Sequence, residues 1–367
     1  MDTNSRLKSI DALRGFDMLF ISGLAPLIVA VCSLWPDCGF AGWLSSQMHH
    51  AEWNGFTQYD TIFPLFLFLA GMSFPFSWNK QKANGKTRKQ IVFKIIRRGF
   101  TLCLIGLILN GLLRFGPLSD LRFASVLGHI GIAWMCAALL YINFKPRTLG
   151  FIAGAILIGY WLVMWLVPGV DDPFSFQNNL AGTVDRMILP GRLHENNYFD
   201  PEGWMSTIPA IVTALLGMFT GEFVRTPSTK ISGGKKTLVL LAAALVLIAV
   251  SLVWNQVFPI NKKLWTSSFV CAAAGYSLVF FALFYWLIDV KGWTKWSFPL
   301  RVIGMNSITI YAAQNIIDFR GIRDFFFKGL SGLCPTPWND IVNNAAYILI
   351  IWLFLYFLYR KKVFLKV

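Results

Sequence analysis

A histidine and an aspartate ten residues apart stand at the beginning of a long apolar segment in this 367-residue chain. His50 lies in a polar loop, and Asp60 enters the apolar segment that follows it. An acid at membrane depth is costly and usually functional, and an imidazole can take or give a proton near neutral pH. The pair therefore predicts chemistry, proton-coupled transport or a contact that holds helices together.

The segments that position this pair are those of a membrane protein. Hydrophobic residues make up 56% of the chain and charged residues only 14%, and the mean hydropathy is +0.56. A soluble domain carries nearly twice that charged fraction. Apolar segments near the length of a spanning helix lie at 16–35, 57–78, 99–113, 123–142, 149–167, 206–224, 237–257, 266–288, 298–316 and 342–359. We expect an all-α polytopic membrane protein of about ten transmembrane helices that form one domain over residues 1–367.

The distribution of positive charge predicts the orientation. With the N-terminus inside, 24 of the 33 Lys and Arg residues fall on the cytoplasmic side, so the positive-inside rule places both termini in the cytoplasm. Three long loops then lie outside, at 33–55, 168–205 and 317–340, and we expect any polar pocket beyond the bilayer to be built from them alone. The net charge of +15 follows from this bias and from attraction to anionic membrane lipid. It does not indicate a nucleic-acid partner.

Other reactive side chains have simpler interpretations. The sequence contains no P-loop, HExxH or paired CxxC motif, so we predict no metal site. Cys38 and Cys334 both fall in outside loops, where a disulfide could form on an oxidising face. His129 lies inside an apolar segment and is expected to be a packed core residue, and His49 is expected to be a solvated loop residue.

Several motifs, in order along the chain, resemble the heparan-alpha-glucosaminide N-acetyltransferase family of transmembrane acyltransferases. They run from near residue 6 to the C-terminus, as in a compact bacterial member that acts in the cytoplasmic (inner) membrane. The motifs are Arg6–Gly15, His50–Pro64, Asn179–Arg186, Phe199–Gly203, Gly304–Ile308 and Tyr359–Phe364. Two features depart from the family pattern. Ser22 stands where the family often has an asparagine near the outer end of the first span, and a Gln-Arg pair is missing near His129.

The resemblance implies that acetyl is moved from cytoplasmic acetyl-CoA to the amine of glucosamine, or of a terminal glucosaminide, on the outer face. It also implies a homodimer. The family's histidine aligns with His50, which is suited to be a general base or an acetyl-carrying nucleophile. Asp60 would orient the imidazole, or else pair with a helix-packing partner. Asn306 would bind a thioester oxygen or the pantetheine amides, or else join helices.

Candidate binding residues follow from the two faces. For the phosphates of the cosubstrate we expect cations at the inside ends of spans, namely Arg14, Arg97 and Arg98, with Lys94, Arg301 and Lys362 behind them. The alternative for each is an ordinary positive-inside anchor. For the acceptor sugar we expect Asn54, Asp200, Glu202 and Arg192, with His194 nearby. The alternative there is that the acids of Asp200–Gly203 begin a helix.

Two other functions remain open from the sequence. An amino-sugar transporter or permease would also place Asp60 and Asn306 at membrane depth, although no internal repeat is evident in the sequence. An acyltransferase that acts on another envelope glycan is the nearest alternative.

Overall fold

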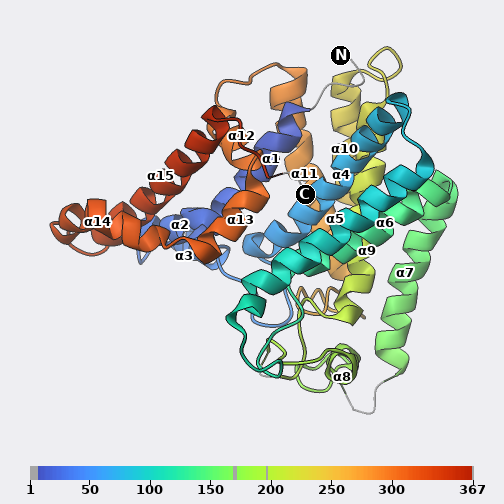
Figure 1. Cartoon of the computed structure of the whole chain (residues 1–367), viewed down its shortest axis with the longest axis horizontal. Coiled ribbons are helices and arrows are strands. Elements are labelled where there is room, and N and C mark those ends of the chain that lie inside the picture. Colours follow the sequence, from blue (N-terminus) through green and yellow to red (C-terminus); the bar gives the residue numbers. More distant parts are fainter. Residues whose placement is uncertain (1–6, 168–171, 196, 366–367) are drawn as a thin grey trace.

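The computed structural model describes residues 7–167, 172–195 and 197–365, and within these ranges it contains helices and loops but no β-strand (Figure 1). Eight helical segments are long and apolar enough to cross a membrane, which confirms the expected all-α polytopic membrane fold. They are Lys8–Cys32, Gln58–Ala83, Val126–Asn143, Pro146–Leu166, Trp204–Arg225, Gly233–Trp254, Ser267–Val290 and Trp338–Arg360. Arg6 of the first motif and residues 168–171 and 196 of the second outside loop lie outside the described residues.

The α-helices, in chain order, are α1 (Lys8–Leu19), α2 (Ala25–Cys32), α3 (Gly39–Ser46), α4 (Ile62–Ala83), α5 (Arg88–Leu109), α6 (Val126–Asn143), α7 (Pro146–Leu166), α8 (Leu180–Ile188), α9 (Trp204–Arg225), α10 (Gly233–Trp254), α11 (Ser267–Phe284), α12 (Phe298–Gly304), α13 (Ser307–Ile316), α14 (Phe319–Gly332) and α15 (Trp338–Arg360). Short π-helical turns are η1 (Phe20–Leu24) and η4 (Tyr285–Val290), and 3₁₀ turns are η2 (Gln58–Thr61) and η3 (Leu112–Arg114).

Two segments that were expected to span the membrane, 99–113 and 298–316, are not among these eight, and the structure shows why. The segment 99–113 belongs to α5, whose first half carries basic residues, so the helix as a whole is more polar than a simple span. The segment 298–316 is divided into α12 and α13, because Met305 and Asn306 interrupt the helix. A broken helix of this kind is tolerated at membrane depth only where it is buried in protein or lines a cavity.

Helix α4, which follows the His50 loop, lies in the middle of the bundle and packs closely on α9 (Figure 1). Gly71 allows this approach, since a Cβ built there would lie 2.1 Å from the carbonyl oxygen of Ala214. A second close crossing joins α1 to α12, where Gly15 lies against the backbone of Leu300. Small residues at such crossings are typical of membrane helices. They allow α4 to approach α9 closely, and α1 to approach α12.

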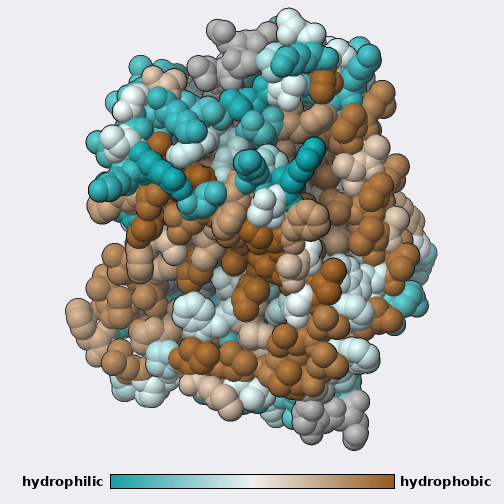
Figure 2. Space-filling view, turned by 90° about the vertical axis from the view of Figure 1, so that its right-hand side faces the viewer, coloured by the Kyte–Doolittle hydropathy of each residue, from teal (hydrophilic) through white to brown (hydrophobic). Residues whose placement is uncertain are grey.

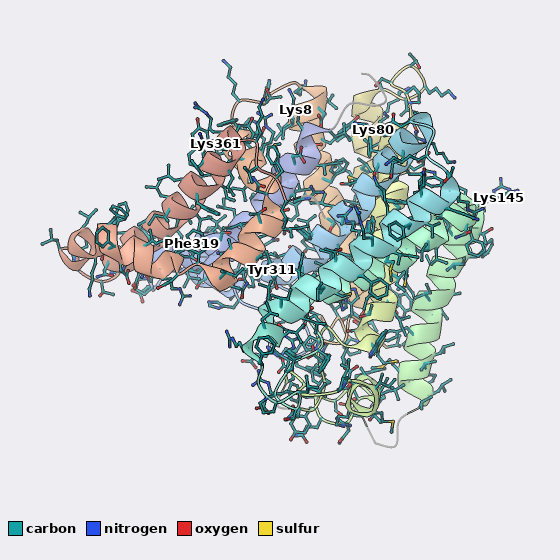
Figure 3. All side chains as sticks on the ribbon, viewed as in Figure 1. Lys8, Lys80, Lys145, Tyr311, Phe319 and Lys361 are labelled. Carbon is teal, nitrogen blue, oxygen red and sulfur yellow. The ribbon has the colours of Figure 1, made fainter. Side chains whose placement is uncertain are left out.

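Hydrophilic and hydrophobic surface residues gather at different heights of the bundle. Figure 2 shows hydrophilic residues gathered at the upper end and a broad apolar region below them. Lys8, Lys80 and Lys361 lie at that upper end (Figure 3), whereas α8 and the loops around it lie at the opposite end (Figure 1). We call the end with Lys8 and Lys80 the lysine end and the end with α8 the loop end.

Candidate active site

His50 and Asp60 meet directly at the loop end. His50 Nδ1 lies 2.7 Å from Asp60 Oδ1, and Asp60 is buried with 1% of its surface exposed. The other carboxylate oxygen, Oδ2, accepts hydrogen bonds from the backbone N–H of Ala51 at 3.2 Å and of Thr57 at 3.1 Å, and it lies 3.0 Å from Thr57 Oγ1. A carboxylate only accepts hydrogen bonds, so Nδ1 carries a proton, and in the neutral form of the imidazole Nε2 then holds the lone pair.

The local fold explains why this pair forms. The 3₁₀ turn η2 begins with a capping box in which Thr57 and Asp60 satisfy each other's backbone N–H groups. Thr57 Oγ1 also donates to the carbonyl of His49 at 2.6 Å, which draws the loop before the turn back over its start. The His50 ring then packs against Tyr59, with ring centroids 4.7 Å apart. Asp60 is therefore both a cap of the turn and the partner of the imidazole.

A lysine completes this group. Lys262 Nζ lies 3.0 Å from His50 Nδ1, 3.1 Å from His50 Nε2 and 3.7 Å from Asp60 Oδ1. Burial lowers the pKa of Lys262, while the charges of Asp60 and Glu202 act in the opposite direction. Lys262 comes from the loop between α10 and α11, far away in the sequence, so tertiary packing alone places it beside the histidine.

These three side chains border a cavity of about 400 Å³. Aromatic and aliphatic walls dominate, and a few charged groups converge on the interior, as is usual for a small-molecule site. The polar residues that line it are His50, Asp60, Arg122, His194, Glu195, Glu202, Lys262 and Lys263, and the aromatic ones are Trp53, Tyr59, Phe63, Trp265 and Tyr311.

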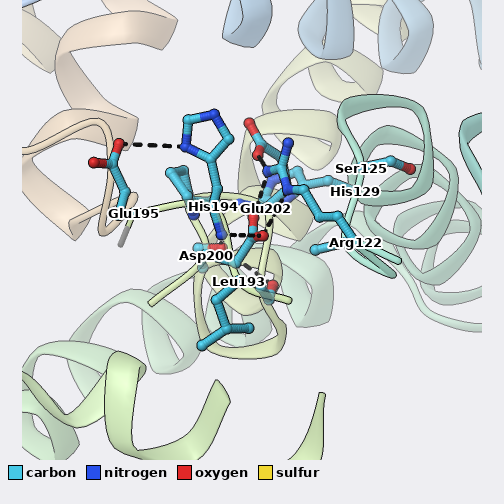
Figure 4. A network of polar contacts seen from close by, with 12 residues as sticks. Arg122, Ser125, His129, Leu193, His194, Glu195, Asp200 and Glu202 are labelled. Atoms are coloured by element: carbon cyan, nitrogen blue, oxygen red, sulfur yellow. Dashed lines mark hydrogen bonds and ion pairs between the residues drawn. The ribbon is translucent and has the colours of Figure 1, made fainter. Parts of the chain in front are cut away.

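An arginine organises the opposite wall of the cavity (Figure 4). Arg122 binds Asp200 with two hydrogen bonds, Nε to Oδ2 at 2.7 Å and Nη2 to Oδ1 at 2.6 Å, and Nη2 also contacts Glu202. Asp200 is fully enclosed and also accepts the backbone N–H of His194 at 3.2 Å. Burial would lower the pKa of Arg122, but Asp200 and Glu202 outweigh it and hold that pKa above its ordinary value. Burial raises the pKa of Glu202.

The four residues expected to bind the acceptor sugar therefore lie in different environments. Glu202 lines the cavity, whereas Asp200 is occupied in holding two loops together. Arg192 is exposed and meets the 110–125 loop through its backbone N–H, which donates to Leu121 O at 3.1 Å. Asn54 accepts a hydrogen bond from Asn261 Nδ2 at 3.1 Å and joins the His50 loop to the Lys262 loop. Neither Arg192 nor Asn54 lines the cavity.

Asn306 lies at the break between α12 and α13 and is buried. Its Oδ1 accepts from Thr309 Oγ1 at 3.3 Å, and its Nδ2 is buried with no hydrogen-bond partner among the described residues. The asparagine is not part of the lining of the His50 cavity; Tyr311, a little further along α13, is.

Two of the six expected phosphate-binding cations, Arg14 and Arg98, are partly buried in the bundle. Arg14 Nη2 donates to Ser73 Oγ at 3.0 Å, and Nη1 lies 3.8 Å from Asp11 Oδ1. The guanidinium of Arg98 lies over the ring of Trp134, 4.3 Å from its centroid, and close enough to Arg14 for the two positive charges to act on each other. Arg98 Nε is buried with no hydrogen-bond partner in the described parts of the chain.

The other four expected cations do not join that pair through any described contact. Lys94, Arg97 and Lys362 are exposed. Arg301 is half-buried, donates to Thr294 O at 3.4 Å and lies near the ring of Phe298.

The expectation that the three long loops alone would build the pocket is wrong. Arg122, Lys262 and Lys263 line the cavity and come from two shorter connections, 110–125 and 255–266, while most of the third long loop forms α14. One feature of the sequence could have indicated that these cations line the cavity. These cations fall on the outer side in the predicted topology, against the positive-inside trend, and such exceptions call for a partner or a function.

His129 and His49 lie as expected, whereas the disulfide considered for Cys38 and Cys334 is not formed. His129 is buried between Phe63 and Trp265 and pairs with Thr207 Oγ1 through Nδ1 at 3.2 Å, so it is a packed core residue. His49 is exposed. Cys38 and Cys334 are free thiols. The described residues contain no cluster of His, Cys, Asp and Glu that would suit a metal ion.

Comparisons with known proteins point to one family. A family model described as heparan-alpha-glucosaminide N-acetyltransferase, catalytic, matches residues 6–235. Heparan-alpha-glucosaminide N-acetyltransferase of Homo sapiens is 28% identical over 417 aligned residues, and that of Mus musculus is 27% identical over 420. Both alignments cover 99% of this chain, which spans 60% of the length of the human relative and 61% of the mouse one.

Proposed function

Because the chain belongs to the family of the heparan-alpha-glucosaminide N-acetyltransferase catalytic region, we propose that it is an acetyl-CoA-dependent N-acetyltransferase embedded in a bacterial inner membrane. Its cosubstrate enters from the cytoplasm at the lysine end. Its acceptor is the amine of glucosamine, or of a terminal glucosaminide, at the loop end. The relatives' names supply the acyl group and the acceptor class, and the site geometry supports the rest of the proposal.

The observation that carries the proposal is the buried Asp60 bonded to His50 Nδ1 at 2.7 Å, at the edge of a cavity of about 400 Å³. A thioester is already activated, so the protein has to position an amine and remove its proton. Nε2 of a neutral His50 can accept that proton from the amine. The same lone pair can instead attack the thioester and carry the acetyl group. On both routes Asp60 fixes the tautomer and stabilises the imidazolium when it forms.

The separation between the two ends suits the cosubstrate. Ser73, the contact of Arg14, follows Asp60 by 13 residues along α4, which at the helical rise is about 20 Å. The extended phosphopantetheine arm, about fifteen bonds of ordinary length, spans on the order of 18 Å. With Arg14 and Arg98 holding phosphate, the thioester reaches the level of His50. The arm thus covers a distance shorter than the bilayer, and the reaction takes place part-way through it.

The test is acetyl transfer by purified protein. With acetyl-labelled CoA and glucosamine, the wild type should form N-acetylglucosamine, and His50→Ala should abolish the reaction, whereas His49→Ala should retain it. Normal turnover by His50→Ala would refute the assignment of His50. Isolation of acetyl on His50 after a single turnover without acceptor would select the acetyl-histidine route, and its absence during active turnover would select direct transfer.

Membrane transport of an amino sugar is the second candidate, and the break between α12 and α13 with buried Asn306 is the observation that favours it. Discontinuous helices of this type form substrate sites in secondary transporters. Vesicles that contain the protein separate the two functions. Uptake of labelled glucosamine without acetyl-CoA, with no N-acetylglucosamine formed, would select transport; acetylated product on the side opposite the acetyl-CoA would select the transferase.

A further inference from the structure

We propose that Lys262 is a further catalytic residue of this site, whose ammonium binds the carbonyl oxygen of the acetyl group as negative charge develops on it. The inference rests on the proposed acetyl transfer. It assigns a partner for the oxyanion, which the His50–Asp60 pair by itself does not supply.

The ammonium of Lys262 lies near the position that the acyl oxygen would take during the reaction. Lys262 Nζ lies 3.1 Å from His50 Nε2, the atom that would attack the acetyl carbon or take the amine proton. Once the acetyl carbon is bonded to Nε2, its oxygen is about 2.3 Å from Nε2 by ordinary bond lengths. Nζ is also 3.0 Å from Nδ1, so it lies over one face of the ring and not along the Nε2 lone pair, and an acyl oxygen turned toward that face comes within hydrogen-bond distance of Nζ.

The chemistry balances with this assignment. On the acetyl-histidine route the Nε2 lone pair forms a bond to the thioester carbon, and the carbonyl electron pair moves to oxygen, where a Lys262 N–H donates to it. Collapse of the oxyanion breaks the C–S bond, and the CoA thiolate leaves with the electron pair. The free amine then adds to the acetyl carbon through a second oxyanion. Collapse breaks the C–Nε2 bond, and Nε2 takes the proton released by the new amide, which then passes to the thiolate.

Direct transfer makes the same demand on Lys262. The amine adds to the thioester carbon, Nε2 takes the amine proton, and the single oxyanion again forms beside Nζ. A positive group that faces developing negative charge is one of the largest contributions to catalysis.

The neighbouring cations are committed elsewhere. Arg122 is bound to both Asp200 and Glu202, and Lys263 Nζ lies 3.1 Å from Glu195 Oε1. Lys262 has its nearest carboxylate oxygen, that of Asp60, at 3.7 Å, too long for a strong hydrogen bond. Its donors are therefore not held by a close carboxylate, and they remain available to a group that binds beside the His50 ring.

The loop around Lys262 is built to hold it in place. Gly55 N–H, in the His50 loop, donates to the carbonyl of Ile260 at 2.8 Å, and Asn261 Nδ2 donates to Asn54 at 3.1 Å. Asn261 Oδ1 accepts the N–H of Leu264 at 2.9 Å and so closes the turn that carries the lysine. The histidine loop and the lysine loop thus form one unit, and rigid support of this kind is what a preorganised donor needs.

The test compares Lys262→Met, Lys262→Arg and, as a matched control, Lys263→Met in single-turnover acetyl transfer from acetyl-CoA to glucosamine. Lys262→Met should reduce the rate about 100- to 1000-fold, as removal of one oxyanion donor does in other enzymes. Lys262→Arg should recover a large part of that loss because it keeps the charge, and Lys263→Met should lose far less.

A second measurement separates the oxyanion from a general disturbance of His50. A methyl sulfonate ester methylates imidazole without forming an oxyanion, and methylation of His50 can be followed by peptide mass spectrometry. Methylation in Lys262→Met should continue at a rate near that of the wild type while acetyl transfer falls. Unchanged acetyl transfer in Lys262→Met, or a parallel fall of both reactions, would overturn the assignment of Lys262 alone. A wild type that transfers no acetyl would refute the proposed function and this inference with it.

Discussion

The two ends of the bundle handle charge in opposite ways. At the loop end every charged group of the cavity has an opposite partner nearby: Asp60 has His50 and Lys262, and Arg122 has Asp200 and Glu202. Toward the lysine end, Arg14 has Asp11 at 3.8 Å, whereas the guanidinium of Arg98 lies over the ring of Trp134 and its Nε has no hydrogen-bond partner in the described residues.

The difference separates two tasks. Buried ion pairs in a closed network fix geometry, which proton transfer and acyl transfer require. A buried guanidinium nitrogen without a hydrogen-bond partner, such as Arg98 Nε, is suited to an anion such as phosphate. The contrast predicts that changes at the loop end alter turnover or folding, whereas changes at the arginine pair alter affinity for the cosubstrate.

Breaking the His50–Asp60 pair should have the largest effect. Asp60→Asn keeps the shape but lets the amide donate to Nδ1, which puts the imidazole proton on Nε2 and removes the lone pair that reacts. We expect kcat for acetyl transfer to fall on the order of 10³- to 10⁴-fold. Glu52→Gln, a change to an exposed acid of the same loop, is the control and should leave kcat near that of the wild type. An Asp60→Asn enzyme with undiminished kcat would show that Asp60 is only structural.

Removing Arg122 should act on folding as well as on turnover. Arg122→Met leaves the buried carboxylate of Asp200 unpaired, which costs about 3–5 kcal/mol, and thermal unfolding in detergent should shift to a lower temperature. Arg192→Met, at an exposed arginine of the adjoining loop, should shift it little. The double variant Arg122→Met/Asp200→Asn should regain much of the loss, because no buried charge is left alone. Equal stability of Arg122→Met and wild type would contradict the proposed anchoring.

Arg98→Met should change affinity and leave the chemistry intact. We expect KM for acetyl-CoA to rise on the order of 10- to 100-fold, since a charged hydrogen bond is worth about 1.5–3 kcal/mol, with kcat little changed. Acetyl-pantetheine lacks the phosphates, so its KM should be the same in variant and wild type. Arg97→Met provides the control at an exposed position one residue away. A loss of equal size with acetyl-pantetheine would argue against phosphate binding by Arg98.

A pH-dependent effect on stability is expected at an acid of the loop end without a tightly bound cation. Asp185 accepts the backbone N–H groups of Asp200 and Trp204 at 3.2 and 3.1 Å, and burial raises its pKa to about 6. Since the folded pKa is raised, the stability linked to this group is complete below the unfolded pKa near 3.9 and is lost as pH rises through 6. The loss amounts to about 3 kcal/mol for a shift of this size.

Asp185→Asn should remove that pH dependence. Unfolding temperature, measured between pH 4 and pH 7, should fall less steeply with pH in the variant than in the wild type. Asp120→Asn, at an exposed acid of the neighbouring loop, should follow the wild-type curve. Parallel curves for Asp185→Asn and wild type would show that Asp185 does not titrate in this range.

Much of the fold and part of the site could be predicted from the sequence. Membrane-length apolar segments are set by composition, because lipid tolerates only helices whose backbone groups are satisfied internally. The His50–Asp60 pair could be proposed because both partners lie within one turn and its preceding loop. The division of 298–316 into α12 and α13 was not predicted, since Met305 and Asn306 interrupt a segment whose hydropathy alone continues.

The remaining site residues illustrate the limit of sequence patterns. Asp200 and Glu202 are close in sequence and were expected to act alike, yet one is enclosed by Arg122 and the other faces the cavity. Arg97 and Arg98 are adjacent, and the helical rotation between them turns one outward and the other toward Trp134. Sequence patterns specify which residue types are present at each end of a span, but not which of them face inward together.

The amino-acid sequence by itself determined that this is a membrane protein with a histidine and an acid at the start of a span, because hydropathy and short-range spacing are local properties. Tertiary structure alone decided that Lys262 would meet His50, more than two hundred residues earlier in the chain, and that Arg98 would lie over Trp134. Those contacts depend on how close the helices approach and on which loops bind one another. Glycines at helix crossings set how closely the helices approach, and buried hydrogen bonds set which loops pair. Neither feature produces a periodic pattern in the sequence.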